Sequence, residues 1–191
     1  MNFPKRTAIF VSLAVILFFR PGFCGQASTV IRSQDWVMFK SDYFDIYAMP
    51  NVDLEAFYKR INRRPFWGMS SNRPVIISSA EEMIANRLDR LMERAERMLD
   101  VYPRPFRVNI RIFKDHDQLN SEYFKIFKTT ADLRSFYIDK FKTIYLSEED
   151  ANDSIAAHEM SHAIVDHYFK IVPPEKIREM IASYVDLHLE D

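Results

Sequence analysis

The sequence predicts an α+β fold contained in one small domain. Segments such as 106–113 alternate apolar and polar residues, which is the spacing of a half-buried strand. Other segments, such as 79–101, place apolar residues three and four apart, which is the spacing of an amphipathic helix. The chain has 191 residues, 48% of them hydrophobic and 16 of them Phe, so it can fill the core of one domain but not comfortably of two.

Residues 1–27 are predicted to be an export signal and not part of the fold. Lys5 and Arg6 precede a 13-residue apolar run from Thr7 to Phe19, which is too short to span a membrane and suits a secretory signal. Small residues favour cleavage after Ala27, which leaves residues 28–191 as a single domain. We therefore expect an exported protein, periplasmic or secreted, without a membrane span after cleavage. An uncleaved N-terminal anchor is the alternative.

Composition and local sequence argue against binding to nucleic acid, against a phosphate-binding loop and against lipid attachment. The 26 basic and 27 acidic residues nearly cancel, and the local basic cluster at 59–64 is typical of a solvated loop, so we expect no nucleic acid partner. Only three Gly are present, which argues against a glycine-rich phosphate loop. Cys24 is preceded by Phe23 and follows Pro21 by three positions, where a lipidation signal has a small and an aliphatic residue. Lipid attachment at Cys24 is therefore not expected.

The first half of the domain is predicted to contain two strands and two helices. Residues 36–40 and 43–48 alternate in strand fashion, and Asp53–Ile61 is a candidate short helix. Pro65, Trp67 and Gly68 lie in a predicted loop at 62–74. A Ser-x-x-Glu capping box then opens a long helix over 79–101, whose apolar residues have core spacing: Ile84, Leu88, Leu91, Ala95 and Met98.

The second half is predicted to run strand, helix and hairpin before the most informative motif. The strand at 106–113 turns Phe106, Val108, Ile110 and Ile112 to one face. Asp115 and Gln118 form a capping pair for a helix that reaches about Phe127. Residues 135–139 and 143–147 form a hairpin around a Lys-Phe-Lys turn.

The motif itself is His158-Glu159-Met160-Ser161-His162, an H-E-x-x-H pattern. Asn152, Asp153 and Ser154 supply a helix start just before it, and no Gly or Pro interrupts the segment until Pro173. On a helix the two imidazoles lie one turn apart on the same face, where they can hold a zinc ion. Glu159, beside them, can take a proton from a metal-bound water.

A catalytic zinc site usually needs a third protein ligand. The H-E-x-x-H-x-x-G-x-x-H pattern fails, because Val165 and Tyr168 stand where Gly and His are required. The other common solution is a Glu on the following helix, and Glu179 lies 17 residues beyond His162, after the tandem prolines at 173–174. Its rivals as third ligand are Asp186 and His188.

Residues 158–184 resemble a small gluzincin metallopeptidase of the thermolysin-related, peptidase MA-like type. These proteins follow H-E-x-x-H with a segment similar to P-x-W-[IL]-x-E-G-x-A-x-[YF], and the matching positions here are Pro174, Ile177, Glu179, Ala182 and Tyr184. The resemblance implies one catalytic Zn²⁺ held by His158, His162 and Glu179, with Glu159 as general base. It also implies a zincin-like fold: a small mixed sheet whose edge strand lies beside the H-E-x-x-H helix, with the Glu ligand on the next helix.

The resemblance further implies that the strand just before the motif is this edge strand and pairs with an extended peptide substrate through Ile144, Tyr145 and Leu146. The alternative is that another part of the chain closes the hairpin. The expected function is that of an exported zinc-dependent metallopeptidase, in which Glu159 activates the zinc-bound water for hydrolysis of peptide bonds.

Several departures from the family pattern keep a second function open. Lys176 and Met180 replace a common aromatic residue and a common Gly, and Ser183 stands where a carboxylate usually orients a ligating imidazole. Asp166 or Asp186 are candidates to substitute for that carboxylate, and Tyr184 or His188 to stabilise the oxyanion. The alternative function is a zinc-binding accessory protein with weak or no turnover. A third, weaker alternative is an exported binding domain in which the motif is coincidental.

Overall fold

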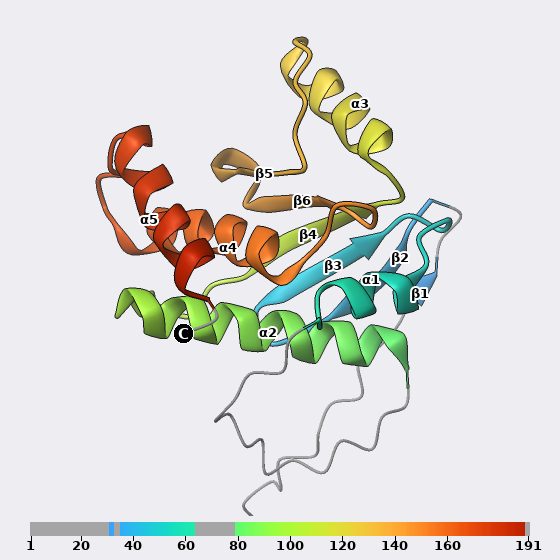
Figure 1. Ribbon diagram of the computed structural model, residues 1–191, viewed down its shortest axis with the longest axis horizontal. Helices are drawn as coiled ribbons and strands as arrows, with labels where there is room; N and C mark the ends of the chain where they lie inside the picture. Colours follow the sequence, from blue (N-terminus) through green and yellow to red (C-terminus); the bar gives the residue numbers. More distant parts are fainter. Residues whose placement is uncertain (1–30, 33–34, 64–78, 190–191) are drawn as a thin grey trace, which may run out of the picture.

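The computed structural model describes residues 31–32, 35–63 and 79–189, and it has the predicted α+β class (Figure 1). The described part contains five α-helices, one 3₁₀ turn and six strands. The helices are α1 (Leu54–Arg60), α2 (Ala80–Leu99), α3 (His116–Phe127), α4 (Asp153–Tyr168) and α5 (Glu175–His188). The strands are β1 (Ile31–Arg32), β2 (Val37–Lys40), β3 (Phe44–Ala48), β4 (Val108–Phe113), β5 (Ser135–Ile138) and β6 (Thr143–Ser147).

The six strands form one mixed sheet in the order β1-β2-β3-β4-β6-β5. β3 pairs with β4, and β4 with β6, in parallel; the other neighbours are antiparallel. The prediction that Ile144, Tyr145 and Leu146 lie on an edge strand is therefore wrong. These three residues of β6 pair with β4 on one side and with β5 on the other, so β5 is the edge strand at this end of the sheet.

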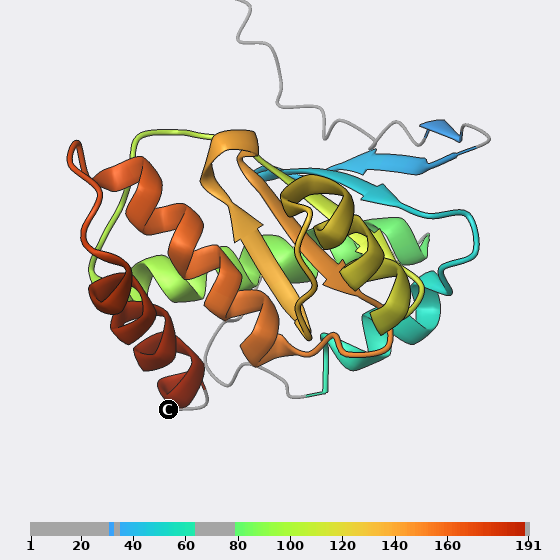
Figure 2. The same cartoon turned by 90° about the horizontal axis from the view of Figure 1, so that it is seen from above.

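The two faces of the sheet carry separate hydrophobic clusters. The larger cluster joins α1, α2 and α4 to one face through side chains such as Phe57, Leu88 and Ile110, all fully buried. The smaller one lies on the other face, where Leu119 of α3 packs near Phe136 and Tyr145. Figure 2 shows α5 beside α4, and the contacts place α5 against both α4 and α2. The helix that carries the H-E-x-x-H motif is thus enclosed by the sheet and two other helices.

Local capping signals explain where several of these elements begin. Ser79, Asp115 and Asn152 are the N-caps of α2, α3 and α4, and the side chain of each accepts a hydrogen bond from a backbone N–H three residues on. The hairpin also forms as predicted, because Lys142 adopts a left-handed conformation (φ 48°) that closes the 3₁₀ turn Asp139–Phe141 between β5 and β6.

Two predictions concern residues outside the described ranges. The export signal at 1–27 lies outside them entirely, and the predicted loop at 62–74 lies outside them from residue 64 onward. Within the described ranges, no helix has both the length and the apolar character needed to cross a bilayer.

Candidate metal centre

Helix α4 presents the two histidines of the motif on one side. The Asn152 side chain accepts a hydrogen bond from the N–H of Ile155 (2.9 Å), which satisfies a free donor of the first turn. The apolar residues on the opposite side of the helix are buried: Ala156, Ala157, Met160, Ala163 and Ile164. His158 and His162 lie one helical turn apart, with ring centroids separated by 5.0 Å and ring planes at 75°.

Helix α5 returns along α4 and brings Glu179 to both histidines. Pro174 is the N-cap of α5, a place where a missing N–H costs little. Ala182 and Val185 are fully buried and fix the helix against its neighbours. Because Glu179 lies about one turn before Ala182, this packing directs the carboxylate of Glu179 toward the His158 and His162 side chains.

The three side chains form a compact donor set. Nε2 of His158 lies 3.5 Å from Oε2 of Glu179, and Nε2 of His162 lies 3.4 Å from Oε1. One ligand atom from each residue falls within 4.8 Å of the others, an arrangement that can hold a metal ion. Two imidazole nitrogens and one carboxylate match the ligand set of catalytic zinc sites, which leave a further position open. Glu179 is 53% exposed, so the group is accessible from solvent.

The electrostatics of His162 favour the form that binds metals. Burial lowers the pKa of His162 to about 4; Glu179 opposes this shift, while His158 and Arg178 act in the same direction as burial. The imidazole is therefore neutral at physiological pH. A neutral imidazole has a free ring nitrogen to donate to an ion.

Glu159 lies beside this donor set but in a different environment. Its side chain is 5% exposed, and burial raises its pKa to about 7. The hydroxyl of Ser135, the first residue of β5, donates a hydrogen bond of 2.6 Å to Oε1 of Glu159, and this contact opposes the shift. A carboxyl group with a pKa near neutrality can both accept and return a proton, as a general base must.

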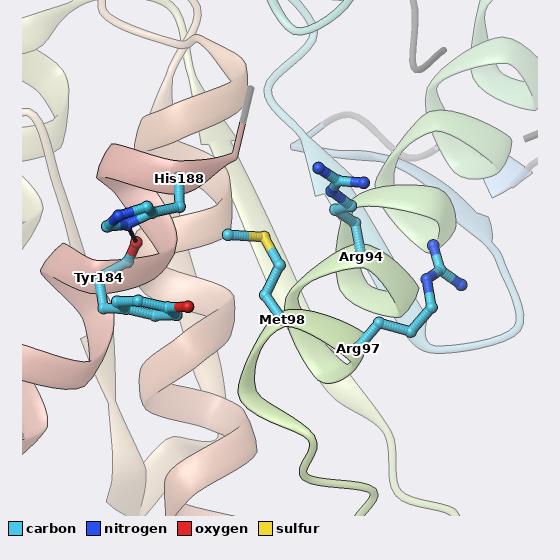
Figure 3. A pocket seen from close by; sticks show the side chains of 5 residues that line it. All are labelled: Arg94, Arg97, Met98, Tyr184 and His188. Carbon is cyan, nitrogen blue, oxygen red and sulfur yellow. Dashed lines mark hydrogen bonds between the residues drawn. The ribbon is translucent and has the colours of Figure 1, made fainter. Parts of the chain in front are cut away.

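The residues expected to orient an imidazole or to stabilise an oxyanion do not join the three-residue donor set. Asp166 accepts hydrogen bonds from the Tyr137 hydroxyl (3.0 Å) and the Lys142 ammonium group, and the imidazole nearest to its carboxylate is that of His167 (4.0 Å). Tyr184 and His188 line a pocket with residues of α2, as Figure 3 shows. Neither His188 nor Asp186 belongs to the three-residue group, so among the candidate third ligands the fold brings Glu179 to the histidines.

Sequence reasoning did not find Ser135. Its partner Glu159 lies 24 positions further along the chain, and no motif links the two residues. The signal that was available is indirect: the hairpin of β5 and β6 directly precedes α4, so its first strand can lie against that helix. Helix α4 does contact β5 in the structure.

Comparison with known proteins adds no relative. No protein-family model, curated protein or solved structure matches this chain. The geometry of the site therefore carries the functional argument by itself.

Proposed function

We propose that this chain is an exported zinc-dependent peptidase of the gluzincin type, with a zincin-like fold. The observation that carries the proposal is the convergence of His158, His162 and Glu179, from two helices that are packed together, next to the buried carboxyl group of Glu159. A metal-binding group alone fits many proteins. The added base beside it, on the residue directly after the first ligand, is what a hydrolase requires.

The chain's own residues supply the proton chemistry. When bound, a zinc ion contributes Lewis acidity, which polarises a carbonyl group and lowers the pKa of water. Glu159 accepts the proton of the water that attacks the peptide carbonyl, and it passes that proton to the amine as the C–N bond breaks. Ser135 holds Oε1 of Glu159 through its hydrogen bond, which leaves the other oxygen of the carboxyl group for the proton transfer.

The edge strand β5 gives the substrate a place to bind. Ser135–Ile138 pairs with β6 on one side, and on its other side the described chain places no strand. An extended peptide can pair with the free N–H and C=O groups of such an edge. Because Ser135 of this same strand touches Glu159, a peptide on β5 passes close to the base. In this proposal β5 takes the role first assigned to Ile144, Tyr145 and Leu146.

A zinc-binding accessory protein without efficient turnover is the second candidate. It is favoured by the contacts of Asp166 with Tyr137 and Lys142, which leave that carboxylate no part in orienting His158 or His162. It is favoured as well by the position of Tyr184 and His188 against α2, where they do not serve a developing oxyanion. Both candidate functions include a bound zinc ion, and they differ in whether the protein hydrolyses peptide bonds efficiently.

Glu159→Gln tests the proposal and separates the two candidates. The variant keeps the shape of the side chain and removes the base, so we expect it to fold, retain about one zinc ion per chain and lose peptidase activity by about 10²–10⁴-fold. The matched control is Glu175→Gln, an exposed position on α5 that should behave as wild type. Zinc content is measured by elemental analysis, and activity with a broad peptide library.

The results of this experiment distinguish the two candidate functions. Equal activity in the Glu159→Gln variant and the wild type would show that Glu159 is not the base. Zinc-loaded wild-type protein that cleaves nothing in the library would favour the accessory candidate. A chain that binds no zinc when it is supplied would refute both.

A further inference from the structure

The exposed apolar side chains of this protein are concentrated in one region. Twelve large hydrophobic side chains are exposed in the described part of the chain, and eight of them fall within residues 168–187. Four of the eight lie on α5 at intervals of three, four and three residues: Ile177, Met180, Tyr184 and Leu187. We call these four residues the α5 stripe. Apolar residues that gather on a surface in this way mark sites of interaction.

The α5 stripe faces away from the core. On a helix with 3.6 residues per turn, its four residues fall within roughly 80° of arc. The buried residues Ala182 and Val185 lie on the opposite side of α5 and pack inward. The spacing of the stripe is that of the a and d positions of a heptad, which is the pattern one helix offers to another. The stripe therefore has the geometry of a helix-binding surface.

A pocket adjoins the stripe at Tyr184. It has a volume of about 300 Å³ and is lined by Arg94, Arg97 and Met98 of α2 and by Tyr184 and His188 of α5. Figure 3 shows Met98 lying between the two arginines and the aromatic pair, with its thioether directed toward Tyr184 and His188. The stripe thus continues into a recess with an apolar centre and a basic side.

One donor on the basic side of the pocket, on Arg94, is unsatisfied. Nε of Arg94 is buried and has no hydrogen-bond partner, although buried polar atoms are normally satisfied. Arg97 lies beside it, with Nη1 3.9 Å from a carboxylate oxygen of Glu93. The guanidinium groups of Arg94 and Arg97 make this side of the pocket positive, so it complements the charge of an entering carboxylate, and a charge-assisted hydrogen bond to a guanidinium group is among the stronger ones.

We propose that the α5 stripe and its adjoining pocket bind an amphipathic helix of another protein, with apolar side chains on the stripe and an acidic side chain in the pocket at Arg94. This inference goes beyond the proposed peptidase function and does not depend on it, since neither zinc nor Glu159 takes part. Helix-in-groove recognition of this kind reads apolar anchors at i, i+3 and i+7.

The observations favour this occupant over two others. A second copy of the chain would bring the arginines of both copies to one interface, where like charges repel. A bilayer surface is flat and cannot fill a recess. An amphipathic helix with one acidic residue at the pocket satisfies the spacing, the recess and the charge together.

Selection from a displayed library of helical peptides, with the full chain as bait, tests the proposal. We expect enriched peptides to carry apolar residues at i, i+3 and i+7 and an acidic residue beside them. For the best peptide, fluorescence anisotropy should show at least tenfold weaker binding to Met180→Asp. Phe124→Asp is the matched control, because Phe124 is 48% exposed on α3, away from the stripe, and this variant should bind as wild type does.

Arg94→Met tests the charge separately. It should weaken the acidic peptide at least fivefold and leave a variant peptide, with Gln in place of the acidic residue, unchanged. Enrichment of basic peptides, or equal loss in Met180→Asp and Phe124→Asp, would overturn the proposal. So would sedimentation of the free chain as a dimer that Met180→Asp dissociates, which would assign the surface to a second copy. Binding to anionic phospholipid vesicles that Met180→Asp abolishes, without any enriched peptide, would assign it to membranes.

Discussion

Removal of the Glu179 carboxylate is the sharpest test of the metal centre. Its oxygens lie 3.4 Å and 3.5 Å from the Nε2 atoms of His162 and His158, so Glu179→Ala removes one of three ligand candidates. Structural zinc in small peptides is bound with about 10–16 kcal/mol, shared among four ligands. One ligand then contributes about 2.5–4 kcal/mol, and its loss should raise the Kd for zinc by about 10²–10³-fold.

The measurement is competition for zinc with a chromophoric chelator at neutral pH. Asp186→Ala and His188→Ala are the comparison variants, because the fold leaves both residues outside the three-residue group. Both should retain the wild-type affinity. A change of less than threefold in Glu179→Ala would refute the assignment of this carboxylate as a ligand. A large loss in His188→Ala or Asp186→Ala would mean that α5 binds the metal through its other end.

Two further predictions concern stability and its dependence on pH. Arg87 is 5% exposed and pairs with Asp153 at 2.6 Å. Asp153→Ala should therefore lower the free energy of unfolding, measured by urea denaturation, by about 3–5 kcal/mol. A loss below about 1 kcal/mol would contradict a buried ion pair. Hydrogen bonds with Asp150 and Asp132 raise the pKa of His116 in the folded protein above its unfolded value of 6.5. The protonated side chain therefore stabilises the fold fully below the unfolded pKa, and this stabilisation is lost as the pH rises through the folded pKa. His116→Asn should therefore destabilise the protein more at pH 6 than at pH 9, as measured by urea denaturation at both values, and an equal effect would show that the charge of His116 is not involved.

Sequence patterns predicted the elements whose signals are local. The side chains of Ser79, Asp115 and Asn152 cap helices that begin at the next residue, because an N-cap hydrogen bond needs only three neighbouring positions. These caps depend on chemistry within a short stretch of chain. The proximity of Glu179 to the histidines was expected from the family resemblance, with Asp186 and His188 as alternatives, and it depends on the packing of α5 against α4.

Features that depend on distant segments were missed or predicted wrongly. The second neighbour of β6 is β4, so Ile110 pairs with Ile144 across 34 positions of sequence, and no local signal reports such a parallel pairing. The family resemblance placed the edge of the sheet at β6, and no local signal in the sequence corrected it to β5. The hydrogen bond from Ser135 to Glu159 was missed for the same reason. Sheet order decides which residues flank Glu159, and sheet order is a property of the whole fold.

The two proposed sites share helix α5, whose anchoring is uneven. The buried residues Ala182, Val185 and Leu189 hold its second half, whereas Glu179 and Met180 lie in the exposed first half, which begins at Pro174 without a side-chain cap. The carboxylate of Glu179 is therefore positioned by packing one turn further along the helix. An ion shared with His158 and His162 would add a second attachment of α5 to α4. A partner helix docked on the α5 stripe would contact both halves of α5 on its solvent-exposed side. The proposed metal site and the proposed docking site would therefore both restrain α5, from different sides of the helix.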